Sequence, residues 1–149
     1  MKERYESFTG LIAKIGRYIK RVKSEEMAEY DIKGPHVSCH YQLYNRGPLT
    51  AKQLSDLCDE DKAAISRSIE YLEEHGYIVS DSTVKKRYKS RLTLTEEGMR
   101  VGAVLTEKIN SILDVASSGI TDEERAVMYK CLMTISDNLK KICDEYGEQ

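Results

Sequence analysis

The stretch from Asp61 to Gly76, DKAAISRSIEYLEEHG, is the sequence feature that most constrains the fold. Its apolar residues Ile65, Ile69 and Leu72 recur at steps of three and four, which predicts a helix with one buried face. Asp61 suits the capping position before this helix, and Gly76 suits the left-handed position just past its end. The stretch therefore predicts a short helix whose opposite face is available for another role.

That opposite face combines small residues with hydrogen-bonding side chains near the start of the helix. We assign to it Lys62, Ala63, Ala64, Ser66, Arg67 and Glu70. A helix is about 10–12 Å across and fits the major groove of B-DNA, which is about 12 Å wide. Small residues permit close approach to DNA, and Arg67 offers a fork of donors. The alternative is an ordinary solvent-facing surface.

The residues before this helix predict a second, shorter one. Thr50 and Gln53 have the spacing of a capping box, in which each side chain satisfies a backbone donor of the other residue. The helix that they begin is expected over about residues 51–58. We also assign Thr50 and Lys52, at its start, to the DNA-facing surface.

The residues after Gly76 predict a basic hairpin. Residues 77–79 and 90–95 read as two short strands, the second alternating polar and apolar. Between Ser80 and Leu92, five cations stand against one anion, Asp81. The cations are Lys85, Lys86, Arg87, Lys89 and Arg91. Such a tip supplies phosphate contacts that add affinity without reading sequence, and Arg87 is placed to enter a narrow minor groove. The alternative is a solvated charged loop.

Amphipathic helices are expected at both ends of the chain. Apolar residues recur at helical spacing over about residues 5–29, from residue 95 to 116, and again after a second capping box at Thr121 and Glu124. A short helix is expected around residues 37–44, after a break at Gly34-Pro35. The fold class is therefore mainly α with a small β-wing of two or three strands, arranged as a winged helix-turn-helix.

Four motifs carry a resemblance to a known family. They are Leu49-Thr50-x-x-x-Leu54, Asp61 to Arg67, Leu72-Glu73-x-x-Gly76-Tyr77-Ile78 and Leu94 to Gly98. Together with the flanking helices, they make the chain similar to the MarR (multiple antibiotic resistance regulator) family. One position departs from the family pattern. Lys86 stands where the family usually has an aspartate beside the wing arginine, which leaves open how Arg87 is held.

The resemblance implies a bacterial, homodimeric transcriptional regulator, usually a repressor, that binds a pseudo-palindromic operator in double-stranded DNA. It implies a helical dimerisation region formed by residues 1–33 and 99–149, and a DNA-binding region formed by residues 34–98. Family members commonly respond to small lipophilic or phenolic ligands, and others sense oxidants or zinc. The operator, the regulated genes, the ligand, and repression as against activation are not determined by the sequence.

Composition excludes several other classes. The 149 residues carry a net charge of −2, so the chain is not a general basic nucleic-acid coat. No stretch approaches the roughly 18 apolar residues of a membrane span, and the first residues do not resemble a signal peptide. The four cysteines are widely spaced, which favours a cytoplasmic protein with free thiols. No GxSxG, HExxH or phosphate-binding glycine loop is present, so we expect neither an enzyme nor a cofactor.

Two small-molecule sites are weaker hypotheses. His36, Cys39 and His40 lie on one face of the predicted second helix, where they can ligate zinc if other residues join them; the alternative is packing near a dimer cleft. Tyr18, Tyr30, Tyr41 and Tyr44, with His40, can line an aromatic ligand pocket, or can equally fill a dimer core.

Two further expectations concern function. The acidic residues around Cys58 are expected to disfavour its thiolate. The main alternative to DNA binding is a winged-helix module used only for protein contacts. Salt distinguishes the two, because DNA binding weakens steeply as salt rises whereas an apolar interface hardly responds.

Overall fold

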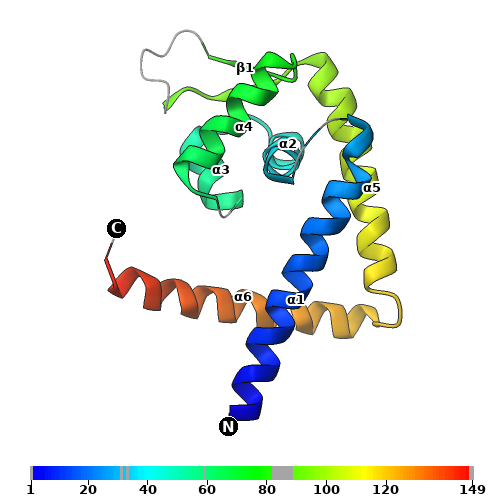
Figure 1. Cartoon of the computed structure of the whole chain (residues 1–149), viewed down its shortest axis with the longest axis vertical. Coiled ribbons are helices and arrows are strands. Elements are labelled where there is room, and N and C mark those ends of the chain that lie inside the picture. The colour runs from blue at the N-terminus through cyan, green and yellow to red at the C-terminus, as the bar shows by residue number, and fades with distance from the viewer. Residues whose placement is uncertain (1, 31, 33, 59, 82–88, 148–149) are drawn as a thin grey trace. The chain divides into compact units, whose positions relative to one another are not determined.

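The structure, a computed structural model, describes residues 2–30, 32, 34–58, 60–81 and 89–147, with side chains from residue 7 onward. It contains two compact units, residues 1–110 and residues 111–149. The elements in chain order are α1 (Lys2–Glu26), the short 3-10 helix η1 (Ala28–Tyr30), α2 (Gly34–Arg46), α3 (Ala51–Cys58), α4 (Lys62–Glu74), β1 (Ile78–Ser80), β2 (Leu92–Leu94), α5 (Glu96–Ala116) and α6 (Asp122–Glu145) (Figure 1). The predicted fold class, mainly α with a small β-wing, is confirmed.

Local capping sets the bounds of α3 and α4. The Gln53 side chain accepts from the Thr50 backbone N–H at 2.9 Å, and the Thr50 hydroxyl accepts from the Gln53 N–H at 3.2 Å, so the capping box predicted there is formed. The Asp61 carboxylate accepts from the Ala64 N–H at 2.7 Å. Beyond α4, Gly76 has a φ of +72°, a left-handed conformation that glycine adopts without steric cost. Both helices thus begin and end close to the predicted residues.

The start of α2 is a correction. Gly34-Pro35 was expected to be a break before the helix, but α2 begins at Gly34. Proline lacks a backbone N–H, and the first turn of a helix has no internal acceptor for that group in any case. Proline therefore suits the first turn of α2 as well as it suits a break.

The wing is a two-stranded antiparallel sheet in which Ile78 pairs with Leu94 and Ser80 pairs with Leu92. Leu49 adds an isolated bridge to Leu92, with N···O distances of 3.3 and 2.8 Å between their backbones, and so occupies the position of a third strand. β1 has the predicted length but begins one residue later, and β2 is shorter than predicted. Residues 82–88 of the hairpin lie outside the described part.

Most of the core of the first unit lies between α2, α3, α4 and the wing, and α2 packs against both α3 and α4. Its buried residues are Cys39, Leu43, Leu49, Leu54, Ile65, Ile69, Leu72, Ile78 and Leu92. A second cluster joins the end of α1 to α2 and α5 through Met27, Ile32, Val37, Val101 and Leu105. Tyr71 and Tyr77 pack against both clusters, so the helix-turn-helix and the start of α5 share one body.

Two glycines allow α5 to approach this body closely. A Cβ at Gly98 would lie 2.0 Å from the Tyr77 carbonyl oxygen, and a Cβ at Gly102 would lie 2.7 Å from the Tyr44 ring. The buried His40 side chain donates from Nε2 to the Gly98 carbonyl at 2.7 Å. The first turns of α5 are therefore held against α2 by contacts that leave no room for another atom.

The apolar stripes of the long helices remain exposed in the single chain. On α1 the stripe comprises Phe8, Leu11, Ile12, Ile15, Ile19 and Val22, each between 36% and 59% exposed. On α6 the exposed large apolar residues are Val127, Tyr129, Leu132, Met133, Leu139 and Ile142. The capping box predicted at the start of α6, between Thr121 and Glu124, is present. None of the described helices is both long enough and apolar enough to cross a membrane.

Candidate nucleic-acid interface

Helix α4 has the two faces that its sequence predicts. Ile65, Ile69 and Leu72 are at most 6% exposed and pack in the core. Lys62, Ala63, Ser66, Arg67 and Glu70 are all exposed. Ala64 is a correction, because it is only 8% exposed and packs inward, so its side chain is not on the outer face. The outer face therefore presents small residues and two cations at the N-terminal half of the helix.

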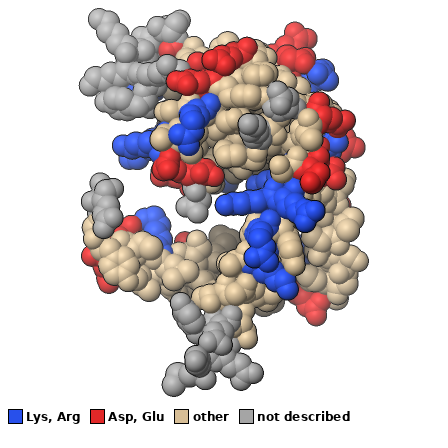
Figure 2. Space-filling view, viewed as in Figure 1, with Lys and Arg blue, Asp and Glu red and all other residues tan. Residues whose placement is uncertain are grey.

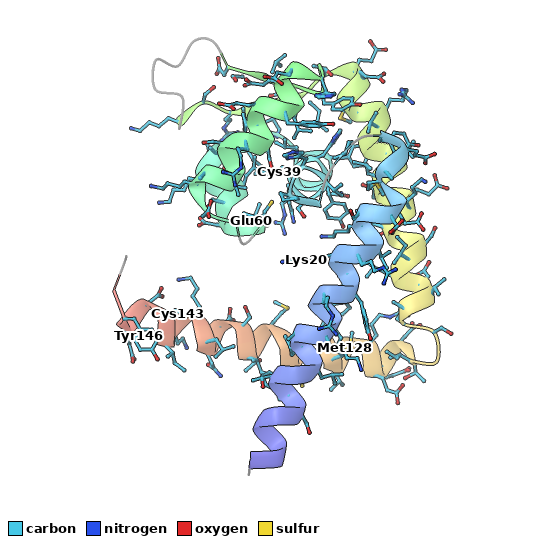
Figure 3. All side chains as sticks on the ribbon, in the orientation of Figure 1. Lys20, Cys39, Glu60, Met128, Cys143 and Tyr146 are labelled. Carbon is cyan, nitrogen blue, oxygen red and sulfur yellow. The ribbon has the colours of Figure 1, made fainter. Side chains whose placement is uncertain are left out.

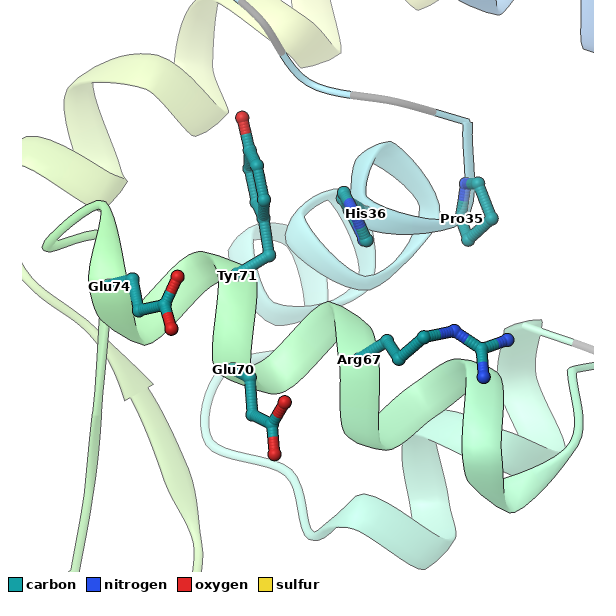
Figure 4. Close-up of a pocket in the computed structure, with 6 residues that line it drawn as sticks. All are labelled: Pro35, His36, Arg67, Glu70, Tyr71 and Glu74. Carbon is teal, nitrogen blue, oxygen red and sulfur yellow. The ribbon is translucent and has the colours of Figure 1, made fainter.

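A shallow cavity of about 460 Å³ opens on this outer face, beside the start of α2. It is lined by Pro35, His36, Arg67, Glu70, Tyr71 and Glu74 (Figure 4). The Arg67 guanidinium extends toward the N-terminal end of α4, whereas the carboxylates of Glu70 and Glu74 lie toward its C-terminal end (Figure 4). Charge along the face thus changes from positive to negative, which favours an approach of phosphate to the front of the helix only.

Two contacts behind this face were not predicted from the sequence. Ser68, which is 0% exposed, hydrogen-bonds through Oγ to Nδ1 of His36 at 2.7 Å. The His36 ring also stacks on Tyr71, with ring centroids 4.4 Å apart. A serine at a position of the buried stripe was the available signal, because a buried hydroxyl requires a partner. These contacts fix α4 against the first turn of α2.

The other residues assigned to DNA contact are described in part. Lys52 is exposed in the first turn of α3, and Lys89 and Arg91 are exposed at the base of the wing. The Thr50 side chain is engaged in the capping box. Lys85, Lys86 and Arg87 lie outside the described residues, so the predicted role of the wing tip stays a prediction.

Basic side chains also gather on α1, where no prediction placed them (Figure 2). They are Lys14, Arg17, Lys20, Arg21 and Lys23. Among them, Arg17 lies over the Tyr18 ring at 5.6 Å from its centroid. Helix α1 therefore carries a basic face as well as its exposed apolar stripe.

The zinc hypothesis does not fit the described contacts. Nδ1 of His36 bonds to Ser68, Cys39 lies in the core, and Nε2 of His40 bonds to the Gly98 carbonyl. Within the part of the chain that the structure describes, no three His, Cys, Asp or Glu side chains are grouped as metal ligands. The spacing puts the three residues on one helix, but their side chains are bonded to different neighbours.

The predicted aromatic pocket is not assembled by the residues assigned to it within one chain. Tyr18 is 53% exposed on α1, whereas Tyr44 packs on Gly102 of α5. His40 is fully buried and bonded to Gly98, and Tyr41 is half-buried on α2. The cavity beside α4 contains none of these residues.

Comparison with known proteins finds chains that share this fold. The chain is 22% identical over 130 residues to an uncharacterized HTH-type transcriptional regulator, YybA, of Bacillus subtilis, covering 87% of each protein. It superposes on a MarR protein from Peptoclostridium difficile with a TM-score of 0.82, 19% identity and coverage of 93% of this chain and 91% of that one. It also superposes on Staphylococcus aureus MarR in complex with salicylate and kanamycin, with a TM-score of 0.81, 16% identity and coverage of 93% and 94%.

The chain has the MarR-family fold. No protein-family model matches it. On the MarR-family fold, α3 and α4 form the helix-turn-helix and β1 and β2 form the wing, as the sequence predicted. The relative from Bacillus subtilis is described as an HTH-type transcriptional regulator.

Proposed function

We propose that the chain is a sequence-specific regulator of transcription that binds double-stranded DNA as a homodimer. The observation that carries this proposal is the outer face of α4. Lys62, Ala63, Ser66 and Arg67 are exposed together at the N-terminal half of a helix whose other face is buried. In helix-turn-helix proteins, the N-terminal residues of the recognition helix contact base edges in the major groove.

Charge and side-chain size on α4 favour DNA binding over a module used only for protein contacts. The exposed front of α4 carries two cations and small side chains rather than the apolar residues that form the centre of a protein interface. Lys52, Lys89 and Arg91 add exposed cations at the start of α3 and the base of the wing. Cations at such positions contact phosphates and set the register of the protein on the duplex.

The homodimer is supported by the exposed apolar stripes of α1 and α6. The α1 stripe is continuous at helical spacing, α6 adds several exposed apolar side chains, and exposed apolar surfaces of this kind mark sites that a partner covers. We assign residues 1–33 and 99–149 to dimerisation and residues 34–98 to DNA binding. We place the tyrosine part of the predicted ligand pocket, Tyr18, Tyr41 and Tyr44, in the dimer, where a second chain can complete it. The salicylate complex of the Staphylococcus aureus protein supports a phenolic ligand. The proposed role is repression in the bacterial cytoplasm.

The decisive experiment measures affinity for a selected operator. DNA sequences bound by the protein are selected from a random pool, and the dissociation constant of the best site is measured from low to high salt. We expect Arg67→Ala to weaken specific binding by about 1–3 kcal/mol, because a lost base or phosphate contact of this kind costs that much. Arg100→Ala is the matched control, because Arg100 is an exposed arginine of α5 that pairs with Glu97 on the same helix.

Two results would contradict the proposal. If operator affinity is unchanged in Arg67→Ala, α4 does not read DNA through the face described above. If binding to the selected DNA hardly weakens as salt rises, phosphate contacts do not contribute, and the alternative of an apolar protein-interaction module is favoured. The double variant Lys89→Ala/Arg91→Ala is expected to weaken binding to all sequences alike and to reduce the salt slope by roughly one unit for each lost contact.

A further inference from the structure

Two opposite charges stand three residues apart on the outer face of α4. Arg67 and Glu70 are both exposed, and both line the shallow cavity beside the start of α2. Their side chains diverge, with the Arg67 guanidinium toward the N-terminal end of the helix and the Glu70 carboxylate toward its C-terminal end (Figure 4). Within the part of the chain that the structure describes, neither side chain forms a hydrogen bond or an ion pair. The face therefore offers a set of donors and a set of acceptors to an external partner.

Two other pairs of opposite charges at this spacing are closed within their own helix. Glu97 and Arg100 of α5 form an ion pair at 2.6 Å, and Asp122 and Arg125 of α6 approach to 3.6 Å. In both pairs the acid precedes the cation, which is the order that agrees with the helix dipole. On α4 the cation comes first. The reversed order weakens pairing within the helix and leaves both groups available.

The backbone beneath these two side chains is fixed from behind. Ser68, on the inner side of the same turn, is 0% exposed and shares a hydrogen bond of 2.7 Å with Nδ1 of His36. Tyr71 stacks on the His36 ring, with the centroids 4.4 Å apart. Helix α2, which carries His36, is itself held in the core through the fully buried Cys39 (Figure 3). Recognition groups on a rigid element keep their direction, so the two charged side chains can meet a fixed pattern of partners.

Each of the two groups matches a different kind of base edge. A guanidinium only donates, and it pairs best with the two acceptors of guanine, O6 and N7. An ionised carboxylate only accepts, and the major groove offers it the amino groups of cytosine and adenine alone. In adenine the amino group lies beside the acceptor N7, which repels a carboxylate, whereas the N4 amino group of cytosine has no acceptor beside it on its own base. The Glu70 carboxylate therefore fits cytosine.

The spacing of the two residues fits neighbouring base pairs. Three residues of an α-helix span about 4.5 Å along its axis, at about 1.5 Å per residue. Successive base pairs of B-DNA are about 3.4 Å apart. The exposed residues Ala63 and Ser66 are small, so they do not prevent the helix from approaching the bases. A helix lying along the groove thus sets Arg67 and Glu70 against adjacent base pairs of one half-site.

We propose that Glu70 determines specificity for a cytosine in each operator half-site, next to a guanine that Arg67 reads. This inference rests on the proposed function and adds to it the composition of the bound sequence. Opposite a base that has no matching donor, the carboxylate is unpaired and lies in the negative potential of the phosphates. Glu70 therefore weakens binding to wrong sites more than it strengthens binding to the right one, which is how a repulsive element produces specificity.

The experiment selects DNA from a random pool with the unmodified full-length protein and with Glu70→Gln. Glutamine has nearly the size of glutamate but offers both an acceptor and a donor, which match the N6 and N7 edge of adenine. We expect the unmodified protein to enrich cytosine at one position of each half-site, and Glu70→Gln to enrich adenine at the same position. Dissociation constants are then measured for four duplexes that differ only there. The unmodified protein is expected to prefer cytosine over the other bases by about 5- to 150-fold.

Glu74→Gln is the matched control, because Glu74 is exposed one turn further along the same helix and its substitution removes the same charge. It is expected to keep the cytosine preference and to raise affinity for all sequences alike. Glu70→Ala is expected to bind mismatched duplexes more tightly than the unmodified protein and to lose the preference at the cytosine position. A general electrostatic effect would raise affinity without changing the preferred base.

Three results would contradict the inference. It is overturned if the unmodified protein enriches an operator but Glu70→Gln selects the same base at every position. It is also overturned if the position that responds to Glu70→Gln is not a cytosine for the unmodified protein. If the unmodified protein enriches no sequence at all, the DNA-binding function itself fails, and the role of Glu70 fails with it.

Discussion

Replacing Gly98 by alanine tests how tightly α5 is held to the helix-turn-helix body. The added Cβ would lie 2.0 Å from the Tyr77 carbonyl oxygen and 3.2 Å from a methyl group of Leu94. Real carbon–oxygen contacts are longer by more than 1 Å, and the obstructing atom belongs to the backbone, which cannot rotate away. The start of α5 must therefore move away from β1.

The cost follows from what that movement disturbs. Overpacking of a core typically costs about 1–3 kcal/mol. The Gly98 carbonyl accepts from buried His40 at 2.7 Å, and loss of a buried hydrogen bond costs about 1–3 kcal/mol more. Alanine regains roughly 1 kcal/mol of helix propensity over glycine. We expect a net loss of about 3 kcal/mol in the free energy of unfolding.

Urea unfolding followed by circular dichroism measures this loss. With a slope of about 2 kcal/mol/M, the midpoint is expected to fall by roughly 1.5 M. Gly102→Ala provides a graded comparison, because its Cβ meets the Tyr44 ring at 2.7 Å and a side chain can shift more easily than a backbone carbonyl. Gly10→Ala on α1 is the control, since no atom lies within 4 Å of its added Cβ, and it is expected to leave stability equal or slightly higher. A midpoint for Gly98→Ala at or above that of the unmodified protein would refute the close-approach reasoning.

Two further predictions concern pH and assembly. Burial lowers the pKa of His40 below its ordinary value of 6.5, against the opposing effect of its bond to Gly98, so the unfolded chain takes up a proton more readily than the folded one. The stability from neutral His40 is therefore fully present above about pH 6.5 and is lost as pH falls toward the folded-state pKa. The free energy of unfolding is expected to decline when it is measured from about pH 7 down to about pH 5. The His40→Gln variant is expected to show a smaller decline. Leu139→Asp is expected to convert a dimer into monomers in sedimentation experiments, because Leu139 is 52% exposed in one chain and available to a partner. Thr134→Asp, on the polar side of α6, should leave the dimer intact, and a normal dimer in Leu139→Asp would argue against the assigned interface.

Local signals explain why so much of α3 and α4 was predictable. The capping groups of Thr50 and Asp61 bond to residues only three positions away, and the spacing of Ile65, Ile69 and Leu72 specifies a buried face whatever the partner. The same local reasoning failed for Gly34-Pro35, because the first turn of a helix and a break before a helix accept the same residues. It also failed for Ala64, because a small residue at the edge of an apolar stripe can lie on either side of the boundary.

The candidate site also has features that the sequence predicted and features that only the tertiary structure decided. The sequence alone determined the helix-turn-helix order and the outer face of α4 with Arg67, because helical periodicity and capping act over a few residues. Only the tertiary structure brought His36 to Ser68 and His40 to Gly98, and it separated the three proposed zinc ligands. These contacts depend on how α2 packs against α4 and α5. The spacing of residues along one helix specifies which face they share, but the neighbouring helices specify which atoms they meet.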